Sequence, residues 1–437
     1  MGSPEYAAII IAALMLSVIL GIPVVLSLGL TSFFGLAWLM GSFEFGSSLL
    51  ASSAFGAIRA YEFATIPLFV LMGEILARSG AASDLFKLIN RSLRVLPGRL
   101  ALATVGGNAV FGAVTGVSIA SAAAFSRIAY PEMVRAKYDK GLALGSIAGS
   151  ASLGMLLPPS VLLIIWGVMA EQSIGKLFIA GVVPGLLLAF LFFLFLLAYA
   201  CLHPRLFGAG KEEELEPEPV EARNLVGALG VSLMVLMVFG GIWFGLFTPT
   251  EAAGMGVLGA VAVGLAKRMR VNDFWHSILD AGRISAPLLF LLITAQMYSR
   301  LLALGGIGGM IGDLFLGVGD VYTVLAIMVM IWLLLGMFLD STSIILLTVP
   351  IFAPIAGTFG LEPLAFAIIG ILVIEAGLLT PPLGLCVYTV KGCVTDPEAT
   401  LGRIFRGSIP YWLILLLVAL LVILFPELAN WLPEKMM

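Results

Sequence analysis

The stretch Gly154-Met155-Leu156-Leu157-Pro158-Pro159 has a counterpart in Gly377-Leu378-Leu379-Thr380-Pro381-Pro382. A glycine followed by a proline pair thus interrupts an apolar segment once in each half of the chain. A proline inside a helix removes a backbone hydrogen bond and clashes with the carbonyl four residues earlier. Both segments are therefore predicted to be helices that unwind at the proline pair. Paired interruptions at corresponding positions of two halves are typical of membrane transporters.

The composition predicts that these helices lie in a membrane. Of the 437 residues, 61% are hydrophobic and 11% are charged, and the mean hydropathy is +1.12. A soluble core of this size could not bury so much apolar surface, so we predict an all-α polytopic membrane protein. The net charge of −3 excludes recruitment of nucleic acid by charge. Three cysteines and two histidines are too few for a zinc or disulfide framework, and no transition-metal site is expected.

Apolar runs of about 20 residues predict five spans in each half of the chain. These runs lie near 5–28, 29–52, 62–79, 141–170 and 174–202, and near 223–247, 250–267, 284–304, 364–392 and 407–430. Two longer runs, 98–130 and 320–357, carry small or polar residues in their middles, which favours helical hairpins that dip into the membrane and return.

The distribution of basic residues predicts the topology, because cytoplasmic loops are enriched in Lys and Arg. With the N-terminus outside, most basic residues fall in cytoplasmic segments, among them Arg78, Lys87, Arg91, Arg94, Arg135, Lys140, Lys267, Arg268, Arg403 and Arg406. Five crossings in each half then force the second half into inverted topology.

We expect three parts. Residues 1–203 form the first repeat, with a hairpin near 98–130 and a broken helix near 141–170. An acidic cytoplasmic linker covers 204–222. Residues 223–437 form the second repeat, with a hairpin near 320–357 and a broken helix near 364–392. A shift of 223 positions supports this division because it superposes Ser118 on Ser341 and Gly154 on Gly377.

The middles of the two hairpins are small and hydroxyl-rich, at Gly112 to Ser121 and at Gly336 to Ser343. A helix restarting near Ser118 or Ser341 would present free N–H groups to an anion. Carbonyl groups freed at the proline pairs need a partner that hydrocarbon cannot supply, and a sodium ion would satisfy them. Two tips facing two breaks would give two cation sites with an anionic substrate between them. Close helix packing by small residues remains an alternative for the first tip.

The sequence leaves two roles open for each of four polar residues. An aspartate in the middle of the membrane, such as Asp340, is costly unless a cation or a proton neutralises it. Asp340 is therefore predicted either to bind sodium or to serve as a helix N-cap. Glu375 and Asn108 are either substrate contacts or structural hydrogen-bonding groups, and Glu74 raises the same question.

The residues assigned to sodium are Thr115, Gly116, Ser118, Gly154, Pro158, Asp340, Ser341, Ser343, Gly377, Thr380 and Pro381. Those assigned to the substrate are Asn108, Ser121, Ser160 and Glu375. No catalytic constellation or phosphate-binding loop is found in the sequence, so we expect no enzymatic activity and no cofactor other than sodium as the coupling ion.

The order of these motifs resembles the large membrane subunit of tripartite ATP-independent periplasmic (TRAP) transporters over nearly the whole chain. The resemblance rests on Ala64 to Phe69, Tyr130 to Met133, Leu157 to Ser160, Leu177 to Gly185, Phe338 to Ser341 and Glu375 to Pro382. One departure is Lys137-Tyr138-Asp139, where the family usually shows Gly-Tyr-Asp.

The resemblance implies a sodium-driven elevator transporter in the bacterial cytoplasmic membrane, in which two hairpins and two broken helices move against a scaffold. It implies a separate small four-helix membrane subunit and a periplasmic binding protein as partners. The implied substrates are organic acids, including C4-dicarboxylates, keto acids and sialic acids. A stand-alone sodium-dicarboxylate symporter of related architecture is the main alternative, and an intramembrane enzyme or assembly scaffold is a second.

Overall fold

The computed structural model describes residues 3–59, 61–208, 222–317 and 319–436. Within these ranges the regular structure is helical, and the pairing of Tyr138 with Phe207 is an isolated bridge outside any strand. Six helices are long and apolar enough to cross a membrane, or up to eight if each of two bent helix pairs counts as one span. The prediction of an all-helical polytopic membrane protein is therefore confirmed.

The N-terminal region folds into shorter helices than the hydrophobic runs predict. It contains α1 (Pro4–Ile19), α2 (Val24–Met40), α3 (Phe43–Arg59), η1 (Tyr61–Ala64) and α4 (Thr65–Ser79). The expected spans 5–28 and 29–52 are wrong in their bounds because turns interrupt both runs. Gly21 and Gly41 have φ values of 82° and 67°, a left-handed conformation that glycine adopts without strain.

A second group of helices packs on α4 or on the neighbours of α4. It contains α5 (Ala81–Ser92), α13 (Ala222–Trp243), α14 (Pro249–Ala266) and α15 (Val271–Gly305). The expected span 284–304 is only the C-terminal part of α15, which is 35 residues long. A buried ion pair between Asp84 and Lys267 joins α5 to the end of α14. After α15 the chain continues into α16 (Ile307–Leu316).

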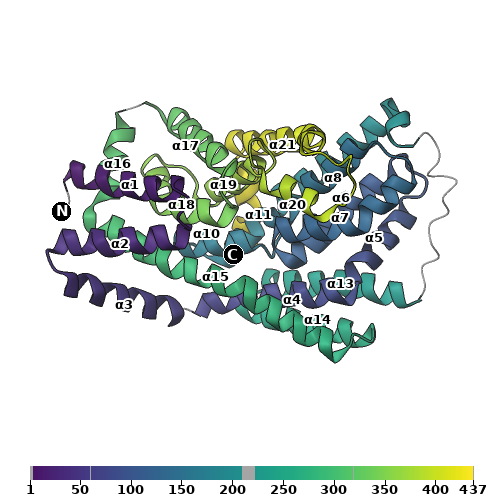
Figure 1. Cartoon of the computed structure of the whole chain (residues 1–437), viewed down its shortest axis with the longest axis horizontal. Coiled ribbons are helices and arrows are strands. Elements are labelled where there is room, and N and C mark those ends of the chain that lie inside the picture. Colours follow the sequence, from purple (N-terminus) through teal and green to yellow (C-terminus); the bar gives the residue numbers. More distant parts are fainter. Residues whose placement is uncertain (1–2, 60, 209–221, 318, 437) are drawn as a thin grey trace.

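Two helix pairs occupy the ranges expected for hairpins. They are α6 (Arg99–Thr115) with α7 (Ser118–Arg135), and α17 (Val321–Gly336) with α18 (Ser341–Thr358). In Figure 1, α6 and α7 lie in the right half of the molecule and α17 and α18 in the left half.

Each helix pair is followed by an interrupted helix and then a long helix. The first set is α8 (Lys140–Ala151), α9 (Leu153–Leu156), α10 (Val161–Met169), α11 (Ile174–Leu202) and the short η2 (Pro204–Leu206). The second set is α19 (Pro363–Gly377), α20 (Leu385–Cys393), α21 (Leu401–Leu424) and α22 (Glu427–Met436). The α8–α9 segment and α10 meet at a bend of 44°.

The segments that follow the two proline pairs pack crosswise. Helix α10, from the first half, packs on α18 of the second half, and α20 of the second half packs on α7 of the first. The two halves therefore share one core, and each hairpin is completed by a helix from the other half.

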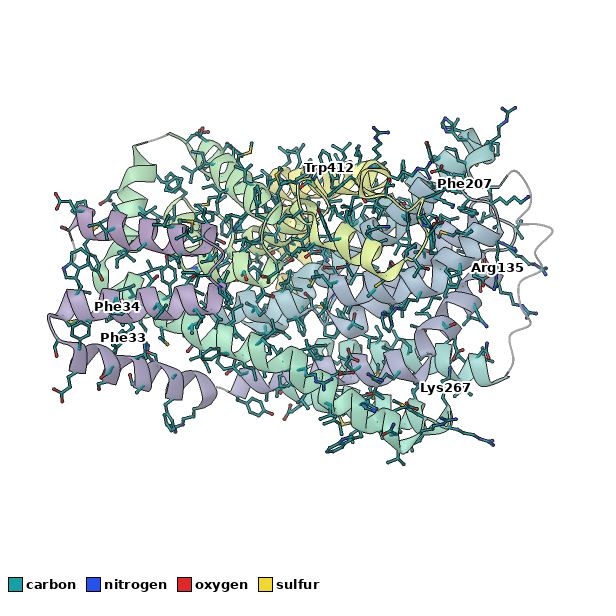
Figure 2. The ribbon with its side chains drawn as sticks, viewed as in Figure 1. Phe33, Phe34, Arg135, Phe207, Lys267 and Trp412 are labelled. Atoms are coloured by element: carbon teal, nitrogen blue, oxygen red, sulfur yellow. The ribbon has the colours of Figure 1, made fainter. Side chains whose placement is uncertain are left out.

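The basic end of the molecule is visible in Figure 2. Arg135, Phe207 and Lys267 lie at one end, and Phe33 and Phe34 lie at the other, where Figure 1 also places the N-terminus. Most of the predicted linker, residues 209–221, lies outside the described residues. Lys137, the departure noted in the sequence, has a φ of 58°, a left-handed conformation that glycine adopts without strain.

Candidate functional site

The turn between α6 and α7 sits directly on the first proline pair. Gly116 ends α6 with a φ of 64°, and its carbonyl accepts a hydrogen bond from the Val161 N–H at 3.3 Å. Farther down α6, a Cβ on Gly112 would lie 2.6 Å from the Cα of Gly154. The hairpin and the broken helix therefore approach through bare backbone, which only glycine permits at these positions.

The turn between α17 and α18 meets the second proline pair in the same way. The Met337 carbonyl accepts a hydrogen bond from the Leu383 N–H at 3.3 Å. A Cβ on Gly336 would lie 2.7 Å from the Cα of Gly377. The two glycines of the sequence motif, Gly154 and Gly377, thus allow each broken helix to pack closely on the facing hairpin.

The two hairpin tips converge on one carboxyl group. Ser341 donates a hydrogen bond from its hydroxyl to Oε1 of Glu375 at 2.7 Å, and the Ser118 hydroxyl is close enough to the same carboxyl group to interact with it electrostatically. The thiol of Cys386 lies 3.7 Å from the Ser118 oxygen. All four residues are buried. These contacts join both predicted tips to the helix before the second break and the helix after it.

Glu375 is incompletely satisfied in this cluster. Its Oε2 atom is buried and has no hydrogen-bond partner, and no ion pair to it is found among the described residues. An uncompensated carboxylate away from water is costly, so the site is suited to a cation or a proton.

Asp340 has one of the two roles predicted for it, that of a helix N-cap. It is the N-cap of α18, and its carboxylate accepts hydrogen bonds from the Ser343 N–H at 3.0 Å and the Ser343 hydroxyl at 2.5 Å. The first tip differs, because α7 begins after Val117 without any side-chain cap. Free N–H groups at a helix start are thus found at the first tip.

Four further predicted residues lie at the tips or at the breaks. The Thr115 and Ser121 hydroxyls are 3.3 Å apart within the first hairpin. Ser160 caps α10 and donates to the Met155 carbonyl at 2.5 Å, which bridges the first break. Thr380 donates to the Gly377 carbonyl at 2.7 Å, so its hydroxyl satisfies one of the carbonyl groups freed at the second break.

Asn108 and Glu74 lie outside the cluster around Glu375. The amide of Asn108 donates to the Ser150 hydroxyl at 2.7 Å between α6 and α8, and the Asn108 Oδ1 atom is buried without a partner. Glu74, in α4, lies beside the Arg78–Asp280 ion pair. Glu74 is therefore part of the contact between α4 and α15, and it lies away from both tips.

The two breaks differ in their exposure. Leu157, Pro158, Pro159 and Ser160 are buried, whereas the stretch 381–383 is exposed. Both proline pairs contain a cis peptide bond, at Pro158-Pro159 and Pro381-Pro382.

Cys386 is the member of the cluster that sequence reasoning missed, because the cysteines were considered only as metal or disulfide ligands. Its place directly after the second break could have signalled a position near the tips.

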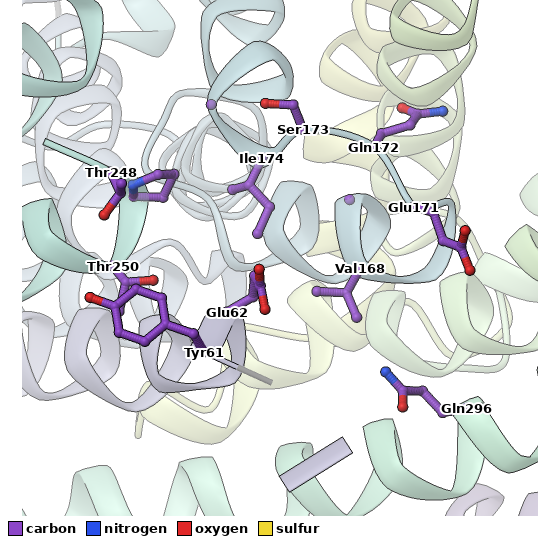
Figure 3. A pocket seen from close by; sticks show the side chains of 13 residues that line it. Tyr61, Glu62, Val168, Glu171, Gln172, Ser173, Ile174, Thr248, Thr250 and Gln296 are labelled. Atoms are coloured by element: carbon purple, nitrogen blue, oxygen red, sulfur yellow. The ribbon is translucent and has the colours of Figure 1, made fainter. Parts of the chain in front are cut away.

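A large cavity lies away from the two tips. It has a volume of about 630 Å³ and lies between η1, the turn joining α10 to α11, the start of α14, and α15 (Figure 3). Its charged lining residues are Glu62 and Glu171, with no Lys or Arg. This acidic cavity does not suit an anionic substrate.

The comparisons with known proteins identify the family of this chain. A sequence profile described as "Tripartite ATP-independent periplasmic transporter, DctM component" matches residues 11–428. The chain belongs to the DctM family. Members of this family are transport proteins of the bacterial inner membrane, so the DctM assignment confirms the membrane location and the absence of an enzymatic role.

Three relatives show the range of this DctM family. The C4-dicarboxylate TRAP transporter large permease protein DctM of Pseudomonas aeruginosa is 32% identical over 88% of this chain and 90% of its own length. The sialic acid TRAP transporter large permease protein SiaM of Vibrio cholerae is 30% identical over 95% of each chain. The ectoine/5-hydroxyectoine TRAP transporter large permease protein UehC of Ruegeria pomeroyi is 30% identical over 98% of this chain and 99% of its own length.

Solved structures show a related fold at lower identity. The Alcanivorax borkumensis YdaH transporter has a TM-score of 0.61 and 15% identity, with 89% of each chain covered. Neisseria gonorrhoeae MtrF has a TM-score of 0.59 and 14% identity, covering 89% of this chain and 84% of its own. At these identities the likeness concerns the fold alone.

Proposed function

We propose that this DctM-family chain imports an organic acid together with sodium ions. The observation that carries the proposal is the convergence of Ser118 and Ser341, one from each hairpin tip, on the buried carboxyl group of Glu375. Hydroxyl, carboxylate and freed carbonyl oxygens are ligands that suit sodium, and unwound helices with such oxygens hold coupling ions in other transporters.

The substrate site in this proposal lies on the side of the first tip. Helix α7 begins without a side-chain cap, and its free N–H groups attract a carboxylate. Ser121 and Thr115 add hydroxyl groups beside this helix start. The relatives named for C4-dicarboxylates and sialic acid support a carboxylate substrate, whereas the one named for ectoine widens the range.

The proposed movement is that of an elevator. The two hairpins and two broken helices share one core through the crosswise packing of α10 on α18 and of α20 on α7. A unit built in this way moves as one body more easily than its parts move separately. Helices α2, α4, α13, α14 and α15, which pack on one another, would supply the scaffold.

Two partners complete the proposed transporter. They are a small four-helix membrane subunit and a periplasmic binding protein that delivers the substrate. In this arrangement the chain alone does not import substrate. The rival proposal, a stand-alone sodium-dicarboxylate symporter, requires uptake by this chain without partners.

Reconstitution in liposomes tests the proposal. Uptake of a labelled dicarboxylate, keto acid or sialic acid is measured with sodium or potassium outside, and each protein component is omitted in turn. We expect uptake only with sodium and all three proteins. Equal uptake in potassium would rule out sodium coupling. Uptake by the chain alone would establish the stand-alone symporter.

Variants of the cluster locate the ion site. Ser118→Ala, Ser341→Ala and Glu375→Gln should each raise the sodium concentration needed for half-maximal uptake by about tenfold, the scale of one lost charge-assisted contact. Ser126→Ala is the matched control, because its buried hydroxyl in α7 donates only to the Ala122 carbonyl at 2.7 Å. An equal effect of the control, or unchanged sodium dependence in the cluster variants, would contradict this placement.

A further inference from the structure

A second polar pocket lies at the basic end of the molecule, away from the hairpin tips. It has a volume of about 330 Å³ and lies between the starts of α8 and α21 and the C-terminal part of α11. Its lining includes Asp139, Phe195, Tyr199, Arg403, Arg406 and Tyr411. Leu206 also lines it, next to Phe207, which Figure 2 places at the same end as Arg135.

The charges in this pocket favour an anion. Arg406 is exposed, and no ion pair or hydrogen bond to it is found in the described residues. Arg403 shares its charge with Glu398 at 3.2 Å. Asp139, the acidic lining residue, caps α8 by accepting from the Leu142 N–H at 2.9 Å, so its charge is directed at the start of that helix.

A buried hydroxyl in the pocket lacks a partner. Tyr411 is fully buried, lines the pocket, and has no hydrogen-bond partner for its Oη atom among the described residues. An unpaired hydroxyl in such a place costs free energy. A ligand with an acceptor oxygen would satisfy it.

Apolar surface extends from this pocket along both long helices. On α21, exposed side chains recur every three or four residues, at Ile409, Leu413, Leu417, Leu420 and Leu424. On α11, Leu186, Phe190 and Leu194 are exposed on the stretch before Phe195 and Tyr199. The Phe195 and Tyr199 rings stack 5.6 Å apart at the pocket wall. Aromatic rings at such a level are typical of membrane interfaces.

We propose that this pocket binds the phosphate headgroup of an anionic phospholipid from the cytoplasmic leaflet, with the acyl chains along the exposed faces of α11 and α21. Basic pockets between membrane helices on the cytoplasmic side hold such headgroups. A free phosphate ion offers the same headgroup chemistry but leaves the apolar surface of both helices unused. The continuity of that surface with Arg406 therefore favours the lipid.

Native mass spectrometry of the purified full chain tests the proposal. The chain is titrated with phosphatidylglycerol and, separately, with phosphatidylcholine, and the bound fractions are compared. We expect preferential retention of phosphatidylglycerol. Equal retention of the two lipids would overturn the proposal, as would displacement of phosphatidylglycerol by millimolar inorganic phosphate, which would identify a site for the free ion.

Substitutions locate the headgroup. Arg406→Gln should weaken phosphatidylglycerol binding about fivefold, and Arg403→Gln with Arg406→Gln about 25-fold, since each arginine near an anionic surface contributes a similar factor. Arg406→Lys should retain binding within about twofold, because it keeps the charge. Tyr411→Phe should weaken binding without lowering the thermal stability, since it removes an unpartnered hydroxyl.

Arg94→Gln is the matched control, because Arg94 is exposed among the basic residues before α6 and does not line the pocket. It should leave phosphatidylglycerol binding unchanged. A loss as large as that of Arg406→Gln would show that the lipid responds to overall charge, and the pocket would then be excluded. Unchanged binding in the double variant would exclude it as well.

Discussion

The two proline breaks have the same motif but different surroundings. The first is buried throughout, because α11 lies against it: a Cβ on Gly181 would be 2.7 Å from the Leu156 carbonyl oxygen. The second is exposed at 381–383, and Leu383 is 39% exposed. The motif therefore determines where the helix unwinds, whereas packing by a neighbouring helix determines whether the unwound backbone can be reached.

The two halves also differ in where their carboxylates and free helix starts lie. The shift of 223 positions places Glu375 opposite Ser152 and Asp340 opposite Val117. Both carboxylates thus lie in the second half, while the helix start without a cap lies in the first. This asymmetry supports cation binding on the side of the second half and anion binding beside α7.

Thiol labelling gives the largest expected contrast between the breaks. In a background with Cys201 and Cys393 replaced by serine, Leu383→Cys should react with a membrane-impermeant maleimide roughly 100-fold faster than Ser160→Cys, because the buried site must first open locally. The rates are measured by mass spectrometry of the purified protein. Equal rates would show that the two breaks are equally covered, and no labelling of Leu383→Cys would place the second break against lipid.

Glycine substitution tests what the two halves share. Gly112→Ala and Gly336→Ala should each lower the free energy of unfolding by about 1 to 3 kcal/mol, because the added Cβ meets backbone in both cases. The measurement is thermal unfolding in detergent. Gly357→Ala, where a Cβ meets nothing within 4 Å, should leave the stability unchanged or raise it. Tolerance at only one of the two close contacts would break the equivalence of the halves.

Capping substitutions test the difference between the tips. Val117→Asn should give α7 a neutral side-chain cap that occupies the free N–H groups at its start. The KM for the substrate should then rise about fivefold, without loss of stability. Asp340→Ala should lower the free energy of unfolding by about 1 kcal/mol through the lost cap. Uptake kinetics and thermal unfolding are the two readouts. An unchanged KM in Val117→Asn would remove the first tip from the substrate site.

The smallest expected effect concerns the loop that follows α20. Hydrogen bonds from Lys140 and Tyr130, both in the first half, lower the pKa of Asp396 to about 2. Because the pKa is lower in the folded state, this stabilisation is complete above pH 4 and is lost as the pH falls from about 4 toward 2. The Tm difference between the wild type and Asp396→Asn should therefore shrink over that interval. A difference independent of pH would show that the carboxylate charge does not contribute.

The sequence predicted the helical membrane class and the positions of the breaks well, because Pro-Pro pairs and long apolar runs are local signals. Helix ends near Gly21 and Gly41 were missed, since a glycine inside an apolar run is tolerated in a membrane helix and also permits a turn. The N-terminal part of α15 was missed because His276, Asp280 and Arg283 interrupt its hydropathy.

The cluster around Glu375 could not be predicted from local signals. Ser118 and Cys386 are 268 positions apart in the chain, and their meeting depends on α20 packing on α7. Glu375 was predicted to be a substrate contact or a structural hydrogen-bonding group, and its contacts with both tips could not be foreseen because they arise from tertiary packing. The role of Asp340 was left open because a cap and an ion ligand have the same sequence signature.

The crosswise packing also has a consequence for biosynthesis. When the ribosome has produced the chain only as far as α11, the surface of α7 that receives α20 has no partner, since α20 is encoded more than 180 residues later. The first hairpin therefore remains incompletely packed in the membrane, with its serine hydroxyls uncovered, until the last quarter of the protein has been translated. Maturation of this protein is thus a late, whole-chain event, and a chain truncated before Leu385 should remain susceptible to membrane proteases.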